Sequence, residues 1–156
     1  MSKETQTRPV LVPVDFSRHS EAALLSAAEF AVCFDQPILV LHVVHDPGDM
    51  PGYYTRAFKK KGLRRIEDAA SEMLEEFLAR IAKENPGKKR LHHMESLLVK
   101  GLPTSRILEI AEKRKAIMIV LGSKGLSGIK HVVMGSVAER VVHAAKIPVT
   151  VVKADS

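Results

Sequence analysis

Two glycine-bearing segments near the C-terminus carry the residue types that bind phosphate. The first, at 122–125, follows an apolar run at 117–121, and the second, at 135–136, precedes a helix-patterned stretch. Glycine lets backbone N–H groups approach an anion closely, and the start of a helix adds partial positive charge. The pattern therefore indicates a phosphate site, with a purely structural turn as the alternative. The residues concerned are Gly122, Ser123, Lys124, Gly125, Gly135 and Ser136.

The two segments do not form either of the common nucleotide-binding motifs. The chain has no Gly-x-x-x-x-Gly-Lys-Ser/Thr sequence, and a dinucleotide fingerprint would follow the first strand rather than a late one. Ser136 could be a helix N-cap instead of, or as well as, a phosphate ligand. Asp15, which follows an early strand, could be a turn or helix-capping residue. His42 stands within an apolar strand, which predicts a buried histidine whose ring is hydrogen-bonded.

The elements that must position these residues alternate between strand and helix. Short apolar runs predict buried strands, and 3.6-residue apolar periods between most of them predict helices. Segment 45–62, rich in glycine and proline, is expected to be an irregular loop, and residues 1–8 a flexible N-terminus. This alternation predicts one domain over 1–156 with a doubly wound parallel sheet. The expected strands are 10–14, 38–44, 93–99, 117–121 and 149–152, with the third nearer an edge.

Composition narrows the classes of function. The net charge of +6 favours anionic ligands, but aromatic residues make up only 4% and Trp is absent, so nucleic-acid binding is not expected. No apolar run reaches the roughly 18–20 residues of a membrane helix. Cys33, the single cysteine, cannot form a disulfide within the chain, and its apolar neighbours predict a small core residue. A cytoplasmic protein is the expectation.

The spacing Gly122-x2-Gly125-x9-Gly135-Ser136 resembles the ATP-binding signature of universal stress proteins. Further stretches similar to that family cover most of the chain, at 10–17, 39–44, 99–103, 137–142 and 147–152. The resemblance implies a five-stranded parallel sheet of order 3-2-1-4-5 with four helices, of the adenine-nucleotide alpha-hydrolase-like type. It also implies a homodimer, which we expect to form through the C-terminal strand, 148–152.

The resemblance further assigns roles to individual residues. Asp15 would accept hydrogen bonds from ribose hydroxyls, Val43 would pack on the base, and Lys124 would add positive charge near the phosphates. The remaining residues divide between the base and ribose (Pro13, Val14), the ribose and first phosphate (Leu121, Gly122) and the phosphates (Ser123, Gly125, Gly135, Ser136, Val137).

We therefore expect a nucleotide-dependent regulatory protein that binds ATP, with Mg²⁺ helping to neutralise the phosphates. No catalytic base or nucleophile stands next to the glycine segments, and no protein metal site is expected. Two alternatives remain open. One is a slow ATP hydrolase or adenylyl-transferring enzyme, and the other is a module whose positive charge recruits nucleic acid or an acidic protein.

Overall fold

The computed structural model describes residues 6–45, 52–62, 65–125 and 133–155. Within these ranges the chain forms one five-stranded sheet of order β3-β2-β1-β4-β5, in which every neighbouring pair is parallel. The strand order and the position of the third strand at an edge are both as predicted. The strands are β1 Val10–Pro13, β2 Ile38–Val44, β3 Glu95–Lys100, β4 Met118–Gly122 and β5 Val149–Val152.

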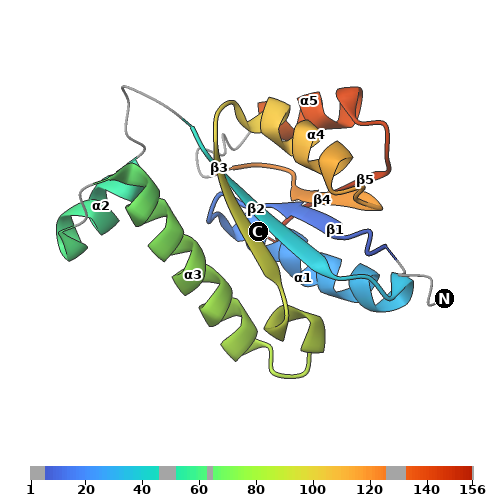
Figure 1. Ribbon diagram of the computed structural model, residues 1–156, viewed down its shortest axis with the longest axis horizontal. Helices are drawn as coiled ribbons and strands as arrows, with labels where there is room; N and C mark the ends of the chain where they lie inside the picture. The colour runs from blue at the N-terminus through green and yellow to red at the C-terminus, as the bar shows by residue number, and fades with distance from the viewer. Residues whose placement is uncertain (1–5, 46–51, 63–64, 126–132, 156) are drawn as a thin grey trace.

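Helices cover both faces of the sheet, with α1 and α3 on one side and α4 and α5 on the other (Figure 1). Alternate residues along β1 therefore enter two different cores. Val10 and Val12 face α1 and α3, whereas Leu11 faces α4 and α5. The described helices are α1 Arg18–Phe34, α2 Gly52–Lys61, α3 Ile66–Glu84, α4 Pro103–Lys113 and α5 Ser136–Ala144, with a 3₁₀ turn, η1, at Lys89–His92.

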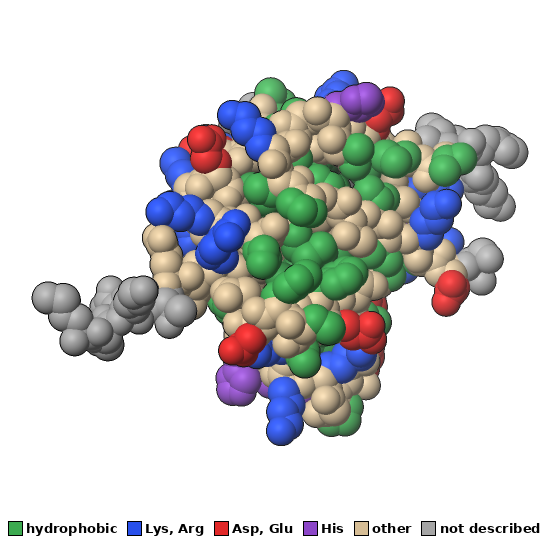
Figure 2. Space-filling model, turned by 90° about the vertical axis from the view of Figure 1, so that its right-hand side faces the viewer, with side chains coloured by type: hydrophobic (Ala, Val, Ile, Leu, Met, Phe, Trp, Pro, Cys, Tyr) green, Lys and Arg blue, Asp and Glu red, His purple; other side chains and the backbone are tan. Residues whose placement is uncertain are grey.

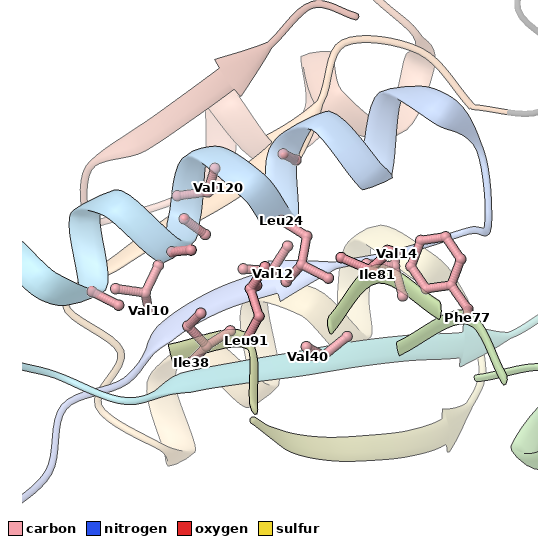
Figure 3. Packing of buried hydrophobic residues seen from close by; sticks show 14 of the residues in the cluster. Val10, Val12, Val14, Leu24, Ile38, Val40, Phe77, Ile81, Leu91 and Val120 are labelled. Carbon is pink, nitrogen blue, oxygen red and sulfur yellow. The ribbon is translucent and has the colours of Figure 1, made fainter. Parts of the chain in front are cut away.

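The larger core lies between the sheet and helices α1 and α3. Figure 3 shows Leu24 of α1 and Ile81 of α3 packed over Val12 and Val40, and all four side chains are inaccessible to solvent or nearly so. Small residues on α1 let the helix lie close to the strands, as its alanine-rich face predicts. This tight packing fixes where β1 ends and α1 begins.

Helix α1 begins with a side-chain cap. The Ser17 hydroxyl accepts a hydrogen bond from the Ser20 backbone N–H at 3.1 Å, as the sequence predicts for an N-cap serine. At the other end Asp35 adopts a left-handed conformation and closes the helix. The helix therefore has defined ends, and its N-terminus lies beside the carboxyl end of β1.

Two predictions about this part of the fold are wrong. Residues Gly52–Lys61 form helix α2, so the segment 45–62 is not irregular throughout, and α2 adds a helix to the four that the resemblance implies. Cys33 is exposed rather than a core residue, because the buried stripe of α1 runs through Ala27, Ala28 and Ala31 and passes beside it. Residues 46–51, from the same predicted loop, lie outside the described residues.

Candidate functional site

A pocket of about 450 Å³ opens at the carboxyl ends of β1, β2 and β4, beside the start of α5. β1 and β4 are the two strands between which the chain reverses its order across the sheet. Ligands of doubly wound sheets bind at this switch point. All twelve residues that we assigned to a site line this pocket: Pro13, Val14, Asp15, Val43, Leu121, Gly122, Ser123, Lys124, Gly125, Gly135, Ser136 and Val137.

The turn between β1 and α1 holds Asp15 toward the glycine segment. The Asp15 Oδ1 atom accepts a hydrogen bond from the Ser17 backbone N–H at 3.1 Å. Its Oδ2 atom lies 2.6 Å from the position that a Cβ atom would take at Gly125. One carboxylate oxygen thus organises the turn while the other faces the loop across the pocket.

Phe16, between Asp15 and Ser17 in the turn, has a φ of 68°. A left-handed conformation is unusual for a bulky side chain and costs about 1–3 kcal/mol. The Phe16 ring packs against His42, with 4.4 Å between ring centroids, and edge-on against Phe77 at 5.6 Å. These two ring contacts hold the strained turn, and so help to fix the direction of Asp15.

His42 is a buried histidine with both ring nitrogens hydrogen-bonded, as the sequence predicts. Its Nδ1 lies 2.7 Å from the Val14 carbonyl oxygen, which can only accept, so Nδ1 carries the proton. In the neutral ring Nε2 then accepts from the Tyr54 hydroxyl. Burial lowers the pKa of His42 below its ordinary value, against the opposing effects of the Val14 carbonyl and Asp15. His42 is therefore neutral at pH 7 and donates to the strand end that lines the pocket.

The described part of the glycine loop is tied to both β5 and α5. The Ser123 N–H donates to the Val152 carbonyl at 2.8 Å, and the Ser123 carbonyl accepts from the Gly135 N–H at 2.6 Å. The Gly135 N–H, which we expected to bind phosphate, is thus already paired within the protein. Gly135 is also the N-cap of α5, so Ser136 occupies the first helical position instead of the cap.

The start of α5 still offers donors to an anion. The N–H groups of Ser136 and Val137 belong to the first helical turn, where no partner exists within the helix. The partial positive charge of the helix N-terminus acts at the same point. Residues 126–132, between the two glycine segments, lie outside the described residues.

The three glycines have different physical reasons for lacking a side chain. A Cβ atom at Gly122 would come within 2.6 Å of the His19 backbone, so this glycine allows α1 to pack on β4. A Cβ atom at Gly125 would collide with the Asp15 carboxylate. At Gly135 the nearest neighbour would be the Ser123 carbonyl oxygen at 3.4 Å, and the φ of −72° suits any residue. The fold itself does not require glycine at position 135.

Among the described residues, the pocket is lined by charges of both signs. Asp15 and half-buried Lys124 line it, and both act on nearby His19. Burial lowers the pKa of His19, with Arg18 and Lys124 contributing in the same direction. No described group of three or more His, Cys, Asp or Glu side chains could hold a metal ion.

Three consecutive lysines at the end of α2, Lys59, Lys60 and Lys61, do not line the pocket. Lys61 instead forms ion pairs with Glu72 and Glu76 of α3.

Within the described ranges, no helix combines the length and the apolar character needed to cross a membrane.

Sequence reasoning missed several residues that line the pocket. Leu41, on β2, and His45, just after β2 ends, lie two residues to either side of Val43, so a period of two from Val43 would have found them. Pro103 and Ile107 share one face of α4 at a spacing of four, but nothing in the sequence pointed that face at the site. The full set of additional lining residues is Ser20, Leu41, His42, His45, Pro103, Ile107 and Ala138.

Comparison with known proteins yields a consistent set of relatives. Residues 6–153 match the model of the Universal stress protein family. A universal stress protein of Methanocaldococcus jannaschii is 32% identical over 152 residues, which span 96% of this chain and 84% of the relative.

Solved structures share the fold. A universal stress protein from Lactobacillus plantarum superposes with a TM-score of 0.70 at 21% identity, covering 96% of this chain and 99% of that one. A universal stress protein from Archaeoglobus fulgidus, solved in complex with dAMP, superposes with a TM-score of 0.58 at 28% identity and covers 96% of this chain and 100% of its own.

Proposed function

Since this chain is a member of the universal stress protein family, we propose that it binds an adenine nucleotide, ATP in particular, in the pocket between β1, β4 and α5. The observation that carries the proposal is the convergence of the twelve assigned residues on this one pocket. The dAMP complex of the related Archaeoglobus fulgidus protein supports an adenine nucleotide as the ligand class.

In this proposal each part of ATP has its own set of lining residues. Val43, Leu121 and Ile107, which line the pocket and belong to one apolar cluster, would pack against the base. Asp15, at the end of β1, would accept hydrogen bonds from ribose hydroxyls. The Ser136 and Val137 amides, the Ser136 hydroxyl and Lys124 would hold the phosphates, with Mg²⁺ adding positive charge there. A nucleoside, which lacks phosphates, would leave the α5 end of the pocket unused.

We propose further that the protein acts as a homodimer through β5, with no chemical step of its own. β5 forms an edge of the sheet. The carbonyl oxygens of Pro148 and Val152 accept hydrogen bonds from β4 and the residue after it, from the Ile119 and Ser123 N–H groups. Because successive residues of a strand point their backbone groups to opposite sides, the N–H and C=O groups of Val149 and Val151 face the open edge. These groups suit pairing with β5 of a second copy.

The surface around this edge supports the same proposal. The side chains of β5 are half-buried, and on the right-hand side of the molecule as drawn in Figure 1, which Figure 2 shows, hydrophobic side chains gather in the middle of the face with charged ones around them. The Ser123–Val152 hydrogen bond joins the glycine loop directly to β5. Nucleotide binding beside Ser123 would therefore reach the dimer edge through one backbone contact, which is the basis for a regulatory role.

A cytoplasmic location remains a prediction, with which the single cysteine agrees.

The test is titration calorimetry with ATP and Mg²⁺ on the wild-type protein, Asp15→Asn and a matched control, Asp35→Asn. An asparagine at 15 can still accept from Ser17 but turns an acceptor that faces the pocket into a donor. We expect ATP affinity to fall about tenfold or more, since a hydrogen bond to a charged group contributes about 1.5–3 kcal/mol. Asp35, exposed and paired with Arg90, should be replaceable without effect on affinity. Equal affinity in all three proteins would refute the role of Asp15, and no binding by any would refute the proposed function.

A further inference from the structure

Helix α2 contacts the rest of the molecule through a buried polar side chain as well as through the Lys61 ion pairs to α3. Tyr54 is completely inaccessible to solvent and packs in a small cluster with Val44 of β2 and Ala70 of α3. Its hydroxyl donates to His42, which itself lines the pocket. The other end of the same imidazole donates to the Val14 carbonyl, at the end of β1. A continuous chain of contacts therefore runs from α2 to the strand end beside Asp15.

This chain of contacts ends beside a strained residue of the turn that carries Asp15. Phe16 has its left-handed backbone conformation immediately after Asp15, and its ring lies on the His42 imidazole. The position of the imidazole thus bears on the Val14 carbonyl through a hydrogen bond and on Phe16 through ring packing. A shift of His42 would change the direction of the carboxylate that stands between these two residues.

We propose that the Tyr54–His42 hydrogen bond couples the docking of α2 to nucleotide binding, with His42 acting as a positioning residue for the 14–17 turn. This coupling rests on the nucleotide binding proposed above. α2 docked through Tyr54 holds the imidazole in place, and the imidazole holds the turn in the conformation that presents Asp15. Because coupling between two sites is reciprocal, a bound nucleotide must stabilise the docking of α2 by the same factor.

As a consequence, nucleotide binding changes how firmly α2 is held and thereby changes the surface that α2 forms. This helix exposes Arg56, Lys59 and Lys60 and contains no acidic residue. A change in how firmly α2 is docked therefore alters a basic surface at a distance from β5, on a different side of the molecule (Figure 1).

The test uses the full chain and the substitution Tyr54→Phe, which removes the donating hydroxyl and keeps the ring. We expect ATP affinity by calorimetry to fall roughly threefold to tenfold, the range of one net hydrogen bond. Ile81→Val is the matched control, because Ile81 is equally buried on α3 but lies outside the pocket. It should lower thermal stability and leave ATP affinity unchanged.

Hydrogen exchange supplies a readout that loss of packing alone would not produce. In the wild-type protein, ATP should slow amide exchange in a peptide spanning α2, and in Tyr54→Phe this slowing should be lost. The substitution His42→Asn keeps a donor for Val14 but cannot reach Tyr54. Combined with Tyr54→Phe, it should weaken ATP binding by less than the product of the two single effects.

The outcomes separate the coupling from the nucleotide site itself. Weaker binding and lost protection in Tyr54→Phe, with a normal control, would support the coupling. Wild-type binding with an unchanged Tyr54→Phe variant, or with equal losses in Ile81→Val, would overturn the coupling alone. Failure of the wild-type protein to bind ATP would overturn the proposed function and the coupling together.

Discussion

Gly135→Val tests whether this glycine serves a ligand rather than the fold. The substitution suits the question because glycine is not needed here for backbone conformation, with φ at −72°, and a Cβ atom would meet its nearest protein neighbour at an ordinary 3.4 Å. A valine would place two further methyl groups between the 123–125 loop and the start of α5, where we expect phosphate.

The expected cost falls mainly on binding. Displacing the phosphate from one backbone N–H of Ser136 or Val137 removes about 1.5–3 kcal/mol, or roughly 10- to 150-fold in affinity. The poorer N-cap residue costs about 1 kcal/mol of stability, which for a chain of this size lowers Tm by about 2–4 °C, and contact of the valine methyl groups with the 123–125 backbone adds to this cost. Calorimetry with ATP and a thermal melt without nucleotide measure the two effects separately.

Two matched glycine substitutions complete the experiment. Gly87→Val, in a turn with open space around it, should change neither affinity nor fold. Gly122→Ala should lower stability by about 1–3 kcal/mol, because its Cβ atom meets the His19 backbone at 2.6 Å and the helix must shift. If Gly135→Val bound ATP as tightly as the wild-type protein, the placement of phosphate at the start of α5 would be refuted.

Three further predictions concern the dimer, pH and helix capping. Val151→Pro removes only an N–H that points to the open edge of β5, so analytical ultracentrifugation of this variant should show folded monomers. Thr150→Pro, the comparison variant, should also disrupt the pairing of β5 with β4. A dimeric Val151→Pro variant would contradict pairing through this edge. The pKa of His42 in the folded protein is lowered from 6.5, so the stabilisation by the neutral ring is complete above pH 6.5 and is lost as the pH falls toward the folded-state pKa. Urea melts from pH 7.5 to 5, about 1–1.5 units either side of the ordinary value, should show the free energy of unfolding decline over this range. A free energy of unfolding that stays constant with pH would count against it. Ser17→Ala should lower the free energy of unfolding by about 1 kcal/mol in the same melts through loss of the Ser20 cap, and an unchanged midpoint would argue against that cap.

The strands and their burial follow from the sequence because nearly continuous apolar runs such as 38–44 have one stable place in a chain of this size, the centre of a covered sheet. Periodicity alone could not place β4 beside β1, since adjacency depends on how helices cross the sheet. That order came from the resemblance and is confirmed by the register of Val10 with Met118.

The errors have physical causes of the same kind. Helix α2 was missed because its glycine and its run of lysines give no apolar period, and among its described side chains the buried one is Tyr54. The pairing of Gly135 N–H with Ser123 depends on how the loop returns to α5, which no local pattern specifies. The collection of pocket residues was predictable because parallel strands present their carboxyl ends together.

Titration calorimetry of the wild-type protein with ATP and Mg²⁺ tests the central claim most directly. The account predicts one nucleotide bound per chain with a dissociation constant below about 1 mM, a limit equivalent to about −4 kcal/mol. Absence of both binding heat and a thermal shift at ATP concentrations well above that limit would contradict it.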